Sequence, residues 1–459
     1  MSTVHDQLAG ELRGNVTSGL TRPLAWRHHQ LHQLSRFLRE QADALTSAMG
    51  ADMGKPDIEG WLTDVAAVMR DVVYADRHLE RWTAPTRRAV PWTLQPGRAR
   101  TVPEPLGAVL VIGPWNYPVR CLLLPAAFAL AAGNSVAVKP SELAPATSRV
   151  IAETLPRYLG PDALRVVEGG PETVRHLLSQ RWDHVFFTGG ARVGRIVMTA
   201  AAQHLTPVTL ELGGKNPAVV DPTADIPTAA RRIVWAKFLN AGQTCVAPDY
   251  VVVHRDREAE LLDALAAQVR HAFGEDPRRS PDYARVVDDR HVQRLTDLLW
   301  RTEAKSVVGG ASDPSQRYVP PTVLAGVSWD DAVMEEEIFG PLLPVLAYDD
   351  LDELLVRMAT REKPLALYLY SRDRGTMARF VNQTSSGSVS VNHSAVQLAV
   401  PELPFGGVGA SGTGAYHGKA GFDTFSHHKA VLVKPPRGEI PLMYPPYGRF
   451  KRWLLGRVL

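Results

Sequence analysis

Short apolar segments that alternate with helical segments constrain the fold of this chain more than any other feature. Residues 106–112 form an apolar run that ends at Gly113 and Pro114, and residues 122–132 then have the composition of a buried helix. Strands this short and this uniformly apolar are typical of parallel sheets that carry helices on both faces. The pattern predicts an α/β fold whose first half is Rossmann-like, with right-handed crossovers.

The alternation continues beyond this first unit and predicts the other elements of two sheets. Strands are expected at residues 135–139, 165–168, 184–188, 209–212, 218–220 and 250–254. Helices are expected at residues 146–159, 192–204, 226–239 and 258–273. The change from one α/β unit to the next is expected near Gly213 and Gly214, and the glycine-rich segment 406–418 predicts a second crossing between the units.

The regions outside this alternation are of different kinds. Two amphipathic helices precede it, because apolar residues recur there at helical spacing: Leu31, Leu34, Leu38 and Leu45, then Leu62, Val65, Met69 and Val72. The proline- and arginine-rich stretch 85–105 predicts either a linker or an extended hairpin arm. The tail, residues 444–459, mixes basic residues with Trp453, Leu454 and Leu455.

Composition excludes several classes of protein. The 459 residues are 45% hydrophobic, which supports a substantial core and excludes a largely disordered chain. Lys and Arg number 51 against 48 Asp and Glu, so the net charge of +3 does not indicate nucleic-acid binding. The first residues lack the apolar core of a secretion signal, and no apolar stretch is long enough to cross a bilayer. A soluble, cytoplasmic protein is therefore expected.

The two cysteines, Cys121 and Cys245, are too few for a disulfide framework. Cys121 lies in the apolar run Arg120-Cys-Leu-Leu-Leu and is expected to be a small buried residue. Cys245 lies among small and polar residues in Asn240-Ala-Gly-Gln-Thr-Cys, directly after a predicted helix. A thiolate nucleophile needs access and a local positive potential, so Cys245 is the candidate nucleophile, with a structural cysteine as the alternative.

Two polar residues at strand ends are candidates for the same chemistry. Glu211 stands between two leucines, where burial raises the pKa of a carboxyl group and suits it to act as a base. The alternative for Glu211 is an ion pair with a nearby lysine such as Lys215. Asn116, in Pro114-Trp-Asn-Tyr-Pro, can donate its amide to an oxyanion, and the alternative is a turn asparagine that bonds its own backbone.

Three further segments are candidates for binding a ligand. Gly189, Gly190 and Gly194 lie where a strand gives way to a helix, so backbone N–H groups there can approach a phosphate, although a helix cap is an equal alternative. Lys139 ends a strand and precedes Glu142, which suits oxygen-rich groups such as ribose or phosphate, or simply a helix cap. The third segment is the acidic run that leads from Glu335 through Glu337 to Phe339-Gly-Pro.

Together these segments resemble the aldehyde dehydrogenase superfamily over nearly the whole chain. In order, they are Pro114-Trp-Asn-Tyr-Pro, Lys139-Pro-Ser-Glu, Phe187-Thr-Gly, Leu210-Glu-Leu-Gly-Gly-Lys, Gly242-Gln-Thr-Cys and Glu337-Ile-Phe-Gly-Pro. Pro404-Phe-Gly-Gly-Val-Gly, Tyr416-His-Gly-Lys and the overall length are similar to the class 3 branch, which includes fatty and aromatic aldehyde dehydrogenases.

The resemblance implies a Rossmann-like NAD(P)-binding domain, an α/β catalytic domain and a small β arm used for oligomerisation. The cofactor domain would comprise residues 1–86 and 106–211, and the catalytic domain residues 212–415. The arm would comprise residues 87–105 and 416–440, followed by the tail 441–459. A homodimer is implied, as in other class 3 enzymes.

The resemblance also implies a reaction, the NAD- or NADP-dependent oxidation of an aldehyde to a carboxylic acid. Cys245 would attack the aldehyde, Asn116 would stabilise the oxyanion, and Glu211 would activate the water that hydrolyses the thioester. The cofactor would be held by Lys139, Glu142, Gly189, Gly190, Gly194, Glu337 and Phe339. A share of base catalysis by Glu337 stays open, and no metal is implied.

The sequence departs from the family pattern at several positions. Gly190 stands where the family usually has serine, which removes a hydroxyl group from the pyrophosphate region. Tyr117, Arg120 and Cys121 are the candidate substrate contacts, and Arg120 favours acidic or carbonyl-rich aldehydes unless it is a surface arginine. The tail is too short to span a membrane, so it either packs on the protein or makes a weak peripheral membrane contact.

Three rival functions remain at this point. An enzyme that passes the thioester to coenzyme A is disfavoured by Glu211, which such enzymes tend to lack. A binding protein that retains only the fold is disfavoured by the complete set of Cys245, Glu211, Asn116 and Glu337. A Cys/His hydrolase is disfavoured because no histidine adjoins Cys245 in the sequence.

Overall fold

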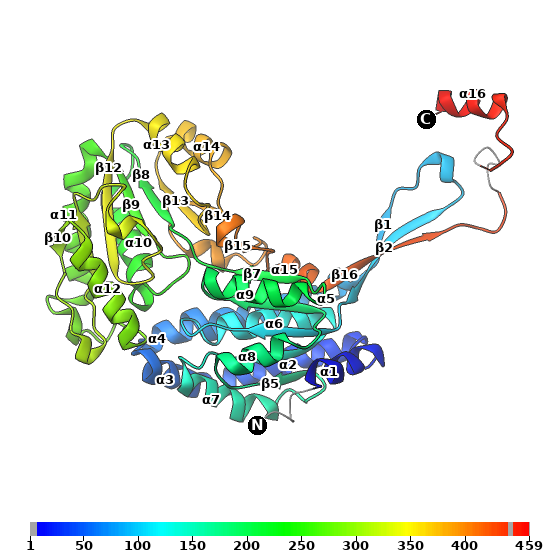
Figure 1. Cartoon of the computed structure of the whole chain (residues 1–459), viewed down its shortest axis with the longest axis horizontal. Coiled ribbons are helices and arrows are strands. Elements are labelled where there is room, and N and C mark those ends of the chain that lie inside the picture. The colour runs from blue at the N-terminus through cyan, green and yellow to red at the C-terminus, as the bar shows by residue number, and fades with distance from the viewer. Residues whose placement is uncertain (1–6, 439–443, 459) are drawn as a thin grey trace.

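The computed structural model describes residues 7–438 and 444–458 and contains three sheets (Figure 1). The first is a six-stranded sheet in the order β15-β7-β6-β3-β4-β5. All neighbouring strands are parallel except the two-residue strand β15, which pairs antiparallel with β7. Its strands are β3 (Ala108–Ile112), β4 (Ser135–Lys139), β5 (Leu164–Val166), β6 (His184–Thr188), β7 (Val208–Glu211) and β15 (Gly412–Thr413).

Helices cover both faces of this sheet, which explains why the central strand β3 is apolar throughout. Ala108, Leu110 and Ile112 point to a core shared with α1, α8 and α9. Val109 and Val111 point to the opposite core, which α6 forms together with α2 and α5. The side chains of a strand alternate between the two faces, so both sets must be apolar when both faces are buried.

The second sheet has seven strands in the order β10-β11-β12-β9-β8-β13-β14 (Figure 1). All neighbours are parallel except β10, which lies antiparallel to β11 at the edge. Its strands are β8 (Pro217–Val220), β9 (Tyr250–His254), β10 (Lys305–Val308), β11 (Thr322–Ala325), β12 (Leu342–Tyr348), β13 (Ala366–Tyr370) and β14 (Ser388–Val391). The predicted α/β fold with parallel sheets is therefore confirmed.

The third sheet is antiparallel and projects from the body of the molecule as an arm (Figure 1). It consists of β1 (Thr86–Arg88), β2 (Arg98–Pro105) and β16 (Ser426–Val433), so residues 85–105 contribute a hairpin rather than a linker. Trp92, Leu432 and Val433 are exposed on it. Use of the arm for dimerisation stays a prediction.

The longer helices begin and end close to the expected positions. Residues 122–132 and 258–273, for example, were predicted as helices and lie in α6 and α11. The helices are α1 (Leu8–Thr17), α2 (Leu24–Glu40), α3 (Ala42–Met53), α4 (Asp57–Gly60), α5 (Ala67–Thr83), α6 (Arg120–Ala132), α7 (Pro145–Thr154), α8 (Pro171–Leu178), α9 (Ala191–Ala202), α10 (Ile226–Phe238), α11 (Glu258–Phe273), α12 (Asp289–Arg301), α13 (Leu351–Ala359), α14 (Arg374–Gln383), α15 (Gly418–Thr424) and α16 (Arg449–Val458).

Two segments near the C-terminus lie elsewhere than the sequence division suggests. Residues 412–413 form β15 in the first sheet, although they were assigned to the catalytic domain. Helix α15 packs against α5 and α6, although residues 416–425 were assigned to the arm. The segment 406–418 thus returns the chain to the first sheet, while the division into domains at residue 211 stays a prediction.

The last helix, α16, lies away from the two large sheets (Figure 1). Phe450 and Trp453 stack on each other at 6.0 Å between ring centroids and both are exposed. The described part of the tail therefore does not pack on the two large sheets, and whether it packs elsewhere on the protein stays a prediction. Among the described residues no helix is long and apolar enough to span a bilayer. The cytoplasmic location and a peripheral membrane contact stay predictions.

Candidate active site

The carboxyl ends of the parallel strands bring several predicted site residues to one edge of the first sheet. In the sheet register, Ile112 lies opposite Lys139, and Thr188 lies opposite Glu211. The segments that follow these strands contain Asn116 and Gly189. Ligands bind at this edge in open α/β sheets because loops and helix N-termini converge there.

Cys245 lies in a tight turn that follows α10. Asn240 and Ala241 have φ values of 51° and 52°, and Gly242 follows with a φ of 75°. A Cβ atom on Gly242 would lie 2.3 Å from the carbonyl oxygen of Gly340, so only glycine fits there. The three successive left-handed residues reverse the chain and leave Cys245 half-exposed.

The side chain of Asn116 is bound to this turn and not to its own. Its Nδ2 donates a hydrogen bond to the carbonyl oxygen of Gln243 at 2.9 Å, and the residue is 5% exposed. Next to it, the hydroxyl group of Tyr117 lies 2.7 Å from Oγ1 of Thr244. The alternative of a self-bonded turn asparagine is therefore wrong, and the segment 114–118 is fixed against the residues that precede Cys245.

A buried ion pair between Lys55 and Asp64, which the sequence did not reveal, supports the backbone at Asn116. Lys55 Nζ lies 3.0 Å from Asp64 Oδ2 and donates to the backbone oxygen of Asn116 at 2.9 Å. Asp64 Oδ1 accepts the N–H groups of Val119 and Arg120 at 3.1 and 2.9 Å. Both charged side chains are fully buried. In the sequence, the only indication of this pair was an acidic residue beside an apolar helix face. No local pattern connects residue 64 with residue 116.

Asn216 is a second positioning residue that was missed. Its Nδ2 donates to the carbonyl oxygens of Cys245 and Ala247 at 2.7 and 3.0 Å, while its Oδ1 accepts the N–H of Ala366 at 2.9 Å. The residue is 1% exposed. Asn216 therefore ties the Cys245 backbone to the second sheet. Its place in Gly-Gly-Lys-Asn-Pro was visible, but its partners lie far along the chain.

Glu211 is a buried carboxyl group without a counter-charge. It is 2% exposed, and neither carboxyl oxygen has a hydrogen-bond partner in the described part of the chain. Burial raises the pKa of the Glu211 carboxyl well above its usual range. The alternative of pairing with Lys215 is wrong, because Lys215 Nζ lies 2.6 Å from Asp249 Oδ2 instead. An unpaired buried acid is costly, and such groups cluster at functional sites.

A cavity of about 220 Å³ opens onto Cys245. Its walls are largely apolar and aromatic and come from both large α/β units and from the segment that returns to the first sheet. They include the three predicted substrate residues Tyr117, Arg120 and Cys121, together with Leu62, Trp235, Leu239, Val246, Val396, Leu398, Phe405 and Tyr416. No histidine of the described chain lines this cavity.

The two thiols of the cavity differ in exposure, although burial raises both pKa values. The pKa of Cys121 rises to about 12, and that residue is 8% exposed. The pKa of Cys245 also lies well above its usual range, because of burial first and then of Cys121, Glu337 and Glu211. The positive charge of Arg120 acts in the opposite direction on both thiols. Cys245 therefore needs help to ionise.

The glycines at the end of β6 create an open helix N-terminus. Gly190 is the N-cap of α9 with an extended backbone, and a Cβ atom there would meet nothing within 4 Å. No acidic side chain occupies the first turn of α9, and the buried Oγ1 of Thr188 has no partner within the described chain. Gly194, unlike Gly190, is tightly packed, since a Cβ atom there would lie 2.9 Å from Leu212 Cδ2. Its location favours close packing of the helix on the sheet.

Lys139 and Glu142 form a pair at the same edge, with Nζ 2.5 Å from Oε2. The lysine side chain is 3% exposed and the glutamate 43%. The cation is therefore held at the strand end while the carboxylate is accessible. Such a pair offers both a donor and an acceptor to hydroxyl groups of a ligand.

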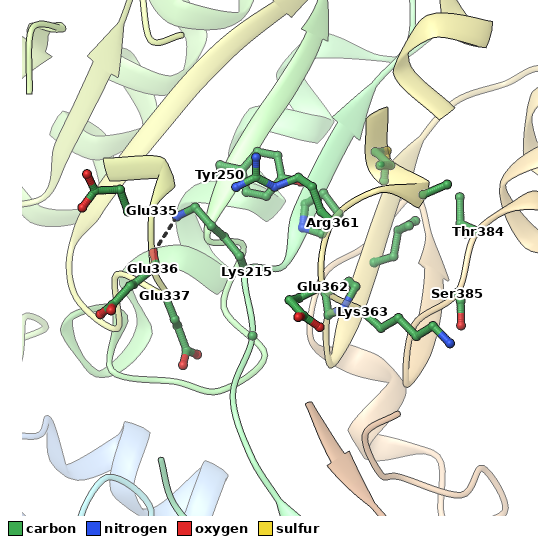
Figure 2. Close-up of a pocket in the computed structure, with 16 residues that line it drawn as sticks. Lys215, Tyr250, Glu335, Glu336, Glu337, Arg361, Glu362, Lys363, Thr384 and Ser385 are labelled. Atoms are coloured by element: carbon green, nitrogen blue, oxygen red, sulfur yellow. Dashed lines mark hydrogen bonds between the residues drawn. The ribbon is translucent and has the colours of Figure 1, made fainter. Parts of the chain in front are cut away.

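Glu337 lies in a loop of the second α/β unit, close enough to Cys245 to affect the pKa of its thiol. Burial raises the pKa of its carboxyl group to about 8. A Cβ atom on Gly213 would lie 2.0 Å from Glu337 Oε2, so the glycine leaves space for this carboxylate. Figure 2 shows Lys215 bonded to the backbone of Glu336, with the Glu337 carboxylate directed away from the lysine. A larger cavity of about 470 Å³ on the lysine side does not include Cys245.

Phe339 follows in the same loop with a positive φ of 44°. Its ring meets Trp115 edge-on at 5.6 Å between centroids. The loop therefore contacts the segment that contains Asn116, which joins the two large sheets at the site.

Comparison with known proteins decides the family. The model of the aldehyde dehydrogenase family matches residues 20–431. The chain belongs to this family. It is 44% identical to aldehyde dehydrogenase family 3 member B2 of Mus musculus, over 97% of this chain and 93% of the relative. It is 43% identical to 4,4'-diaponeurosporen-aldehyde dehydrogenase of Staphylococcus aureus (strain NCTC 8325 / PS 47), over 94% of each protein.

Solved structures of aldehyde dehydrogenases have the same fold. The substrate-bound state of Staphylococcus aureus AldH superposes with a TM-score of 0.96 at 40% identity, and each chain is covered completely. An indole-3-acetaldehyde dehydrogenase in complex with NAD+ gives a TM-score of 0.85 at 26% identity, over 93% of this chain and 88% of the other. The resemblance to the family and its class 3 branch is confirmed, and this aldehyde dehydrogenase is an oxidoreductase that acts on aldehydes.

Proposed function

We propose that this aldehyde dehydrogenase oxidises an apolar aldehyde to the carboxylic acid through a covalent intermediate on Cys245, with NAD or NADP as hydride acceptor. The observation that carries the proposal is that Cys245 lines an apolar cavity. Asn116 is bound to the turn just before Cys245, and the buried Glu211 lies close enough to act on the pKa of the Cys245 thiol. The cavity walls favour a hydrocarbon or aromatic chain on the aldehyde, because apolar pockets bind by excluding water.

The residues at the edge of the first sheet fit a nicotinamide dinucleotide. The open N-terminus of α9 at Gly190 suits a diphosphate, since helix N-termini carry unpaired N–H groups and partial positive charge. The unpartnered Thr188 hydroxyl supports a polar ligand there. Lys139 and Glu142 suit ribose hydroxyl groups, and Glu337 suits the ribose next to the nicotinamide, although neither feature separates NAD from NADP.

The first chemical step belongs to Cys245. Cys245 first gives its proton to a water molecule in the cavity. The thiolate then attacks the aldehyde carbon, a C–S bond forms, and the C=O π electrons move to the oxygen, which becomes an oxyanion. The Asn116 amide and the backbone N–H of Cys245 stabilise that oxygen, at roughly 3–4 kcal/mol for a donor of this kind. A bound nicotinamide would supply the acceptor for the hydride that leaves the aldehyde carbon.

The second step belongs to Glu211. The thioester left on Cys245 must be hydrolysed, and a base has to take a proton from the attacking water. A carboxylate whose pKa is raised is a stronger proton acceptor than an exposed glutamate, and among residues 7–438 and 444–458 Glu211 has no ion-pair partner that would weaken it. Glu337, with a pKa of about 8, is the second candidate for this role.

The rival functions have less support from the geometry. A Cys/His hydrolase needs a histidine beside the thiol, and no histidine of the described chain lines the cavity. Transfer of the acyl group to coenzyme A does not require a buried base, whereas Glu211 is held at the site at an energetic cost.

The function is tested with a panel of aldehydes, both cofactors, and coenzyme A present or absent. We expect one carboxylic acid to form for each reduced cofactor, with the highest kcat/KM for apolar aldehydes because the cavity is lined mainly by apolar side chains. Product analysis by mass spectrometry checks this result. Formation of an acyl-coenzyme A in place of the acid would contradict the role of Glu211.

We further propose that, among aldehydes with an apolar chain, Arg120 favours those that also carry a negative charge. Within the described chain it forms no ion pair, and its Nη2 donates only to the carbonyl oxygen of Leu398 at 3.3 Å. Arg120→Leu is expected to lower kcat/KM for a carboxylate-bearing aldehyde about tenfold relative to a neutral aldehyde of equal length, because a hydrogen bond to a charged group contributes about 1.5–3 kcal/mol. Arg120→Lys, which keeps the charge, is the matched control. If Arg120→Leu keeps the wild-type ratio of kcat/KM between the charged and the neutral aldehyde, Arg120 does not have this role.

A further inference from the structure

Two histidines and one aspartate meet on the outer surface of the first α/β unit, away from the catalytic cavity. His28 and His32 lie one turn apart on α2, and Asp76 faces them from α5, which packs alongside α2. His28 Nδ1 is 2.6 Å from Asp76 Oδ1, and His32 Nε2 is 3.0 Å from Asp76 Oδ2. Residues four apart on a helix share a face, so both imidazoles point at the same carboxylate.

The spacing of these groups matches that of metal ligands. The ligand atoms of all three residues lie within 4.8 Å of one another. Imidazole nitrogen and carboxylate oxygen bind Zn²⁺ at about 2.0–2.2 Å in a tetrahedral arrangement, so two such ligand atoms lie roughly 3.4 Å apart. Each imidazole nitrogen already lies 2.6 or 3.0 Å from a carboxylate oxygen, so a change of side-chain rotamers is enough to bring the three ligands around one ion.

The exposure of the cluster suits an ion that enters from solvent. The His32 side chain is 65% exposed, while those of His28 and Asp76 are 28% and 22% exposed. The carboxylate is thus partly held by its surroundings and the outer histidine is free to adjust. Three protein ligands leave a coordination position for water.

We propose that His28, His32 and Asp76 form a binding site for a late first-row divalent metal ion, with Zn²⁺ as the best fit. Two imidazoles and one carboxylate are the borderline ligands that Zn²⁺ prefers, and neither Mg²⁺ nor Ca²⁺ favours imidazole. An ion held there joins α2 to α5, so it stabilises the helical layer that supports α6. This inference is independent of the proposed oxidation chemistry.

Isothermal titration of the tag-free, full-length protein with Zn²⁺ tests the site. His28→Ala and His32→Ala are the test variants, and His29→Ala is the matched control, because His29 is an exposed residue on the same helix that makes no hydrogen bond to Asp76. Any binding to Cys121 or Cys245 is common to all four proteins and cancels in the comparison. Melting curves in EDTA show that each variant is folded.

We expect the wild-type protein and His29→Ala to share one Zn²⁺ site that His28→Ala and His32→Ala each weaken at least about tenfold. Loss of an outer-shell partner alone already costs about 10–100-fold in affinity, so removal of a ligand costs no less. Zn²⁺ is also expected to raise the melting temperature of the wild type and of His29→Ala only. Equal affinity in all four proteins, or an equal loss in His29→Ala, would overturn the proposal.

Discussion

Cys245→Ala is expected to lower kcat/KM for aldehyde oxidation by at least about 10⁴-fold, because removal of a nucleophile leaves only binding and oxyanion stabilisation. Cys245 is half-exposed at the cavity, next to the turn that Asn116 holds through Gln243. The substitution removes one sulfur atom and fits the space of the original side chain. Steady-state reduction of NAD or NADP with a good aldehyde substrate measures the loss.

Cys121→Ala is the matched control, since this thiol lines the same cavity. Cys121 lies in α6 among apolar residues, and burial raises its pKa to about 12, so it remains a neutral thiol. Its replacement is expected to change kcat/KM by less than about tenfold, as a small change in a pocket wall does. Full oxidation by Cys245→Ala, or an equal loss in both variants, would remove the assigned nucleophile.

Glu211→Gln is expected to separate the two halves of the reaction. The first turnover should still produce one reduced cofactor per active site, because Glu211 acts after the thioester has formed. Steady-state turnover should then fall by about 10²–10⁴-fold, the usual contribution of a general base. A burst of reduced cofactor in stopped-flow absorbance, followed by a slow phase, is the expected signature.

Glu337→Gln is the matched control for the base. Burial raises the pKa of Glu337 to about 8, but this carboxylate lies against Gly213 in the loop from the second sheet. We expect Glu337→Gln to raise the KM for the cofactor without producing a burst of reduced cofactor. A burst in Glu337→Gln and none in Glu211→Gln would transfer the role of base to Glu337.

The strands from β3 to β9 were predictable because each carries its own local signal, whereas β10 to β15 were not predicted. Residues 136–138 and 251–253 are apolar, since both faces of each strand are buried, and the two strands lie at the predicted positions. The hairpin of residues 85–105 was one of two alternatives, because an exposed antiparallel arm has no buried face to impose a pattern on its sequence.

The residues that react were easier to predict than those that position them. Glu211 was recognised because an acid between leucines is unusual, and the structure shows it unpaired. The pair of Lys55 and Asp64, by contrast, lies 61 and 52 residues before the segment at Asn116 that it supports. Such long-range hydrogen bonds leave no periodicity or local composition that could be recognised in one sequence.

Most of the cavity walls, apart from Tyr117, Arg120 and Cys121, were missed for a similar reason. Phe405 and Tyr416 come from the segment that crosses back to the first sheet, and Leu398 precedes it. The sequence predicted the crossing from its glycines but not which of its side chains face Cys245. That depends on the pairing of Gly412 with Glu211, which fixes the segment against the end of β7.

The most direct test of a covalent intermediate is peptide mass mapping of Glu211→Gln after rapid quenching with an aldehyde and the cofactor. Slow hydrolysis should leave the acyl group in place, so the peptide that contains Cys245 is expected to gain the mass of that group. The peptide that contains Cys121 should stay unmodified. An adduct on Cys121, or a cofactor burst without any adduct on Cys245, would contradict the assignment of Cys245 as the nucleophile.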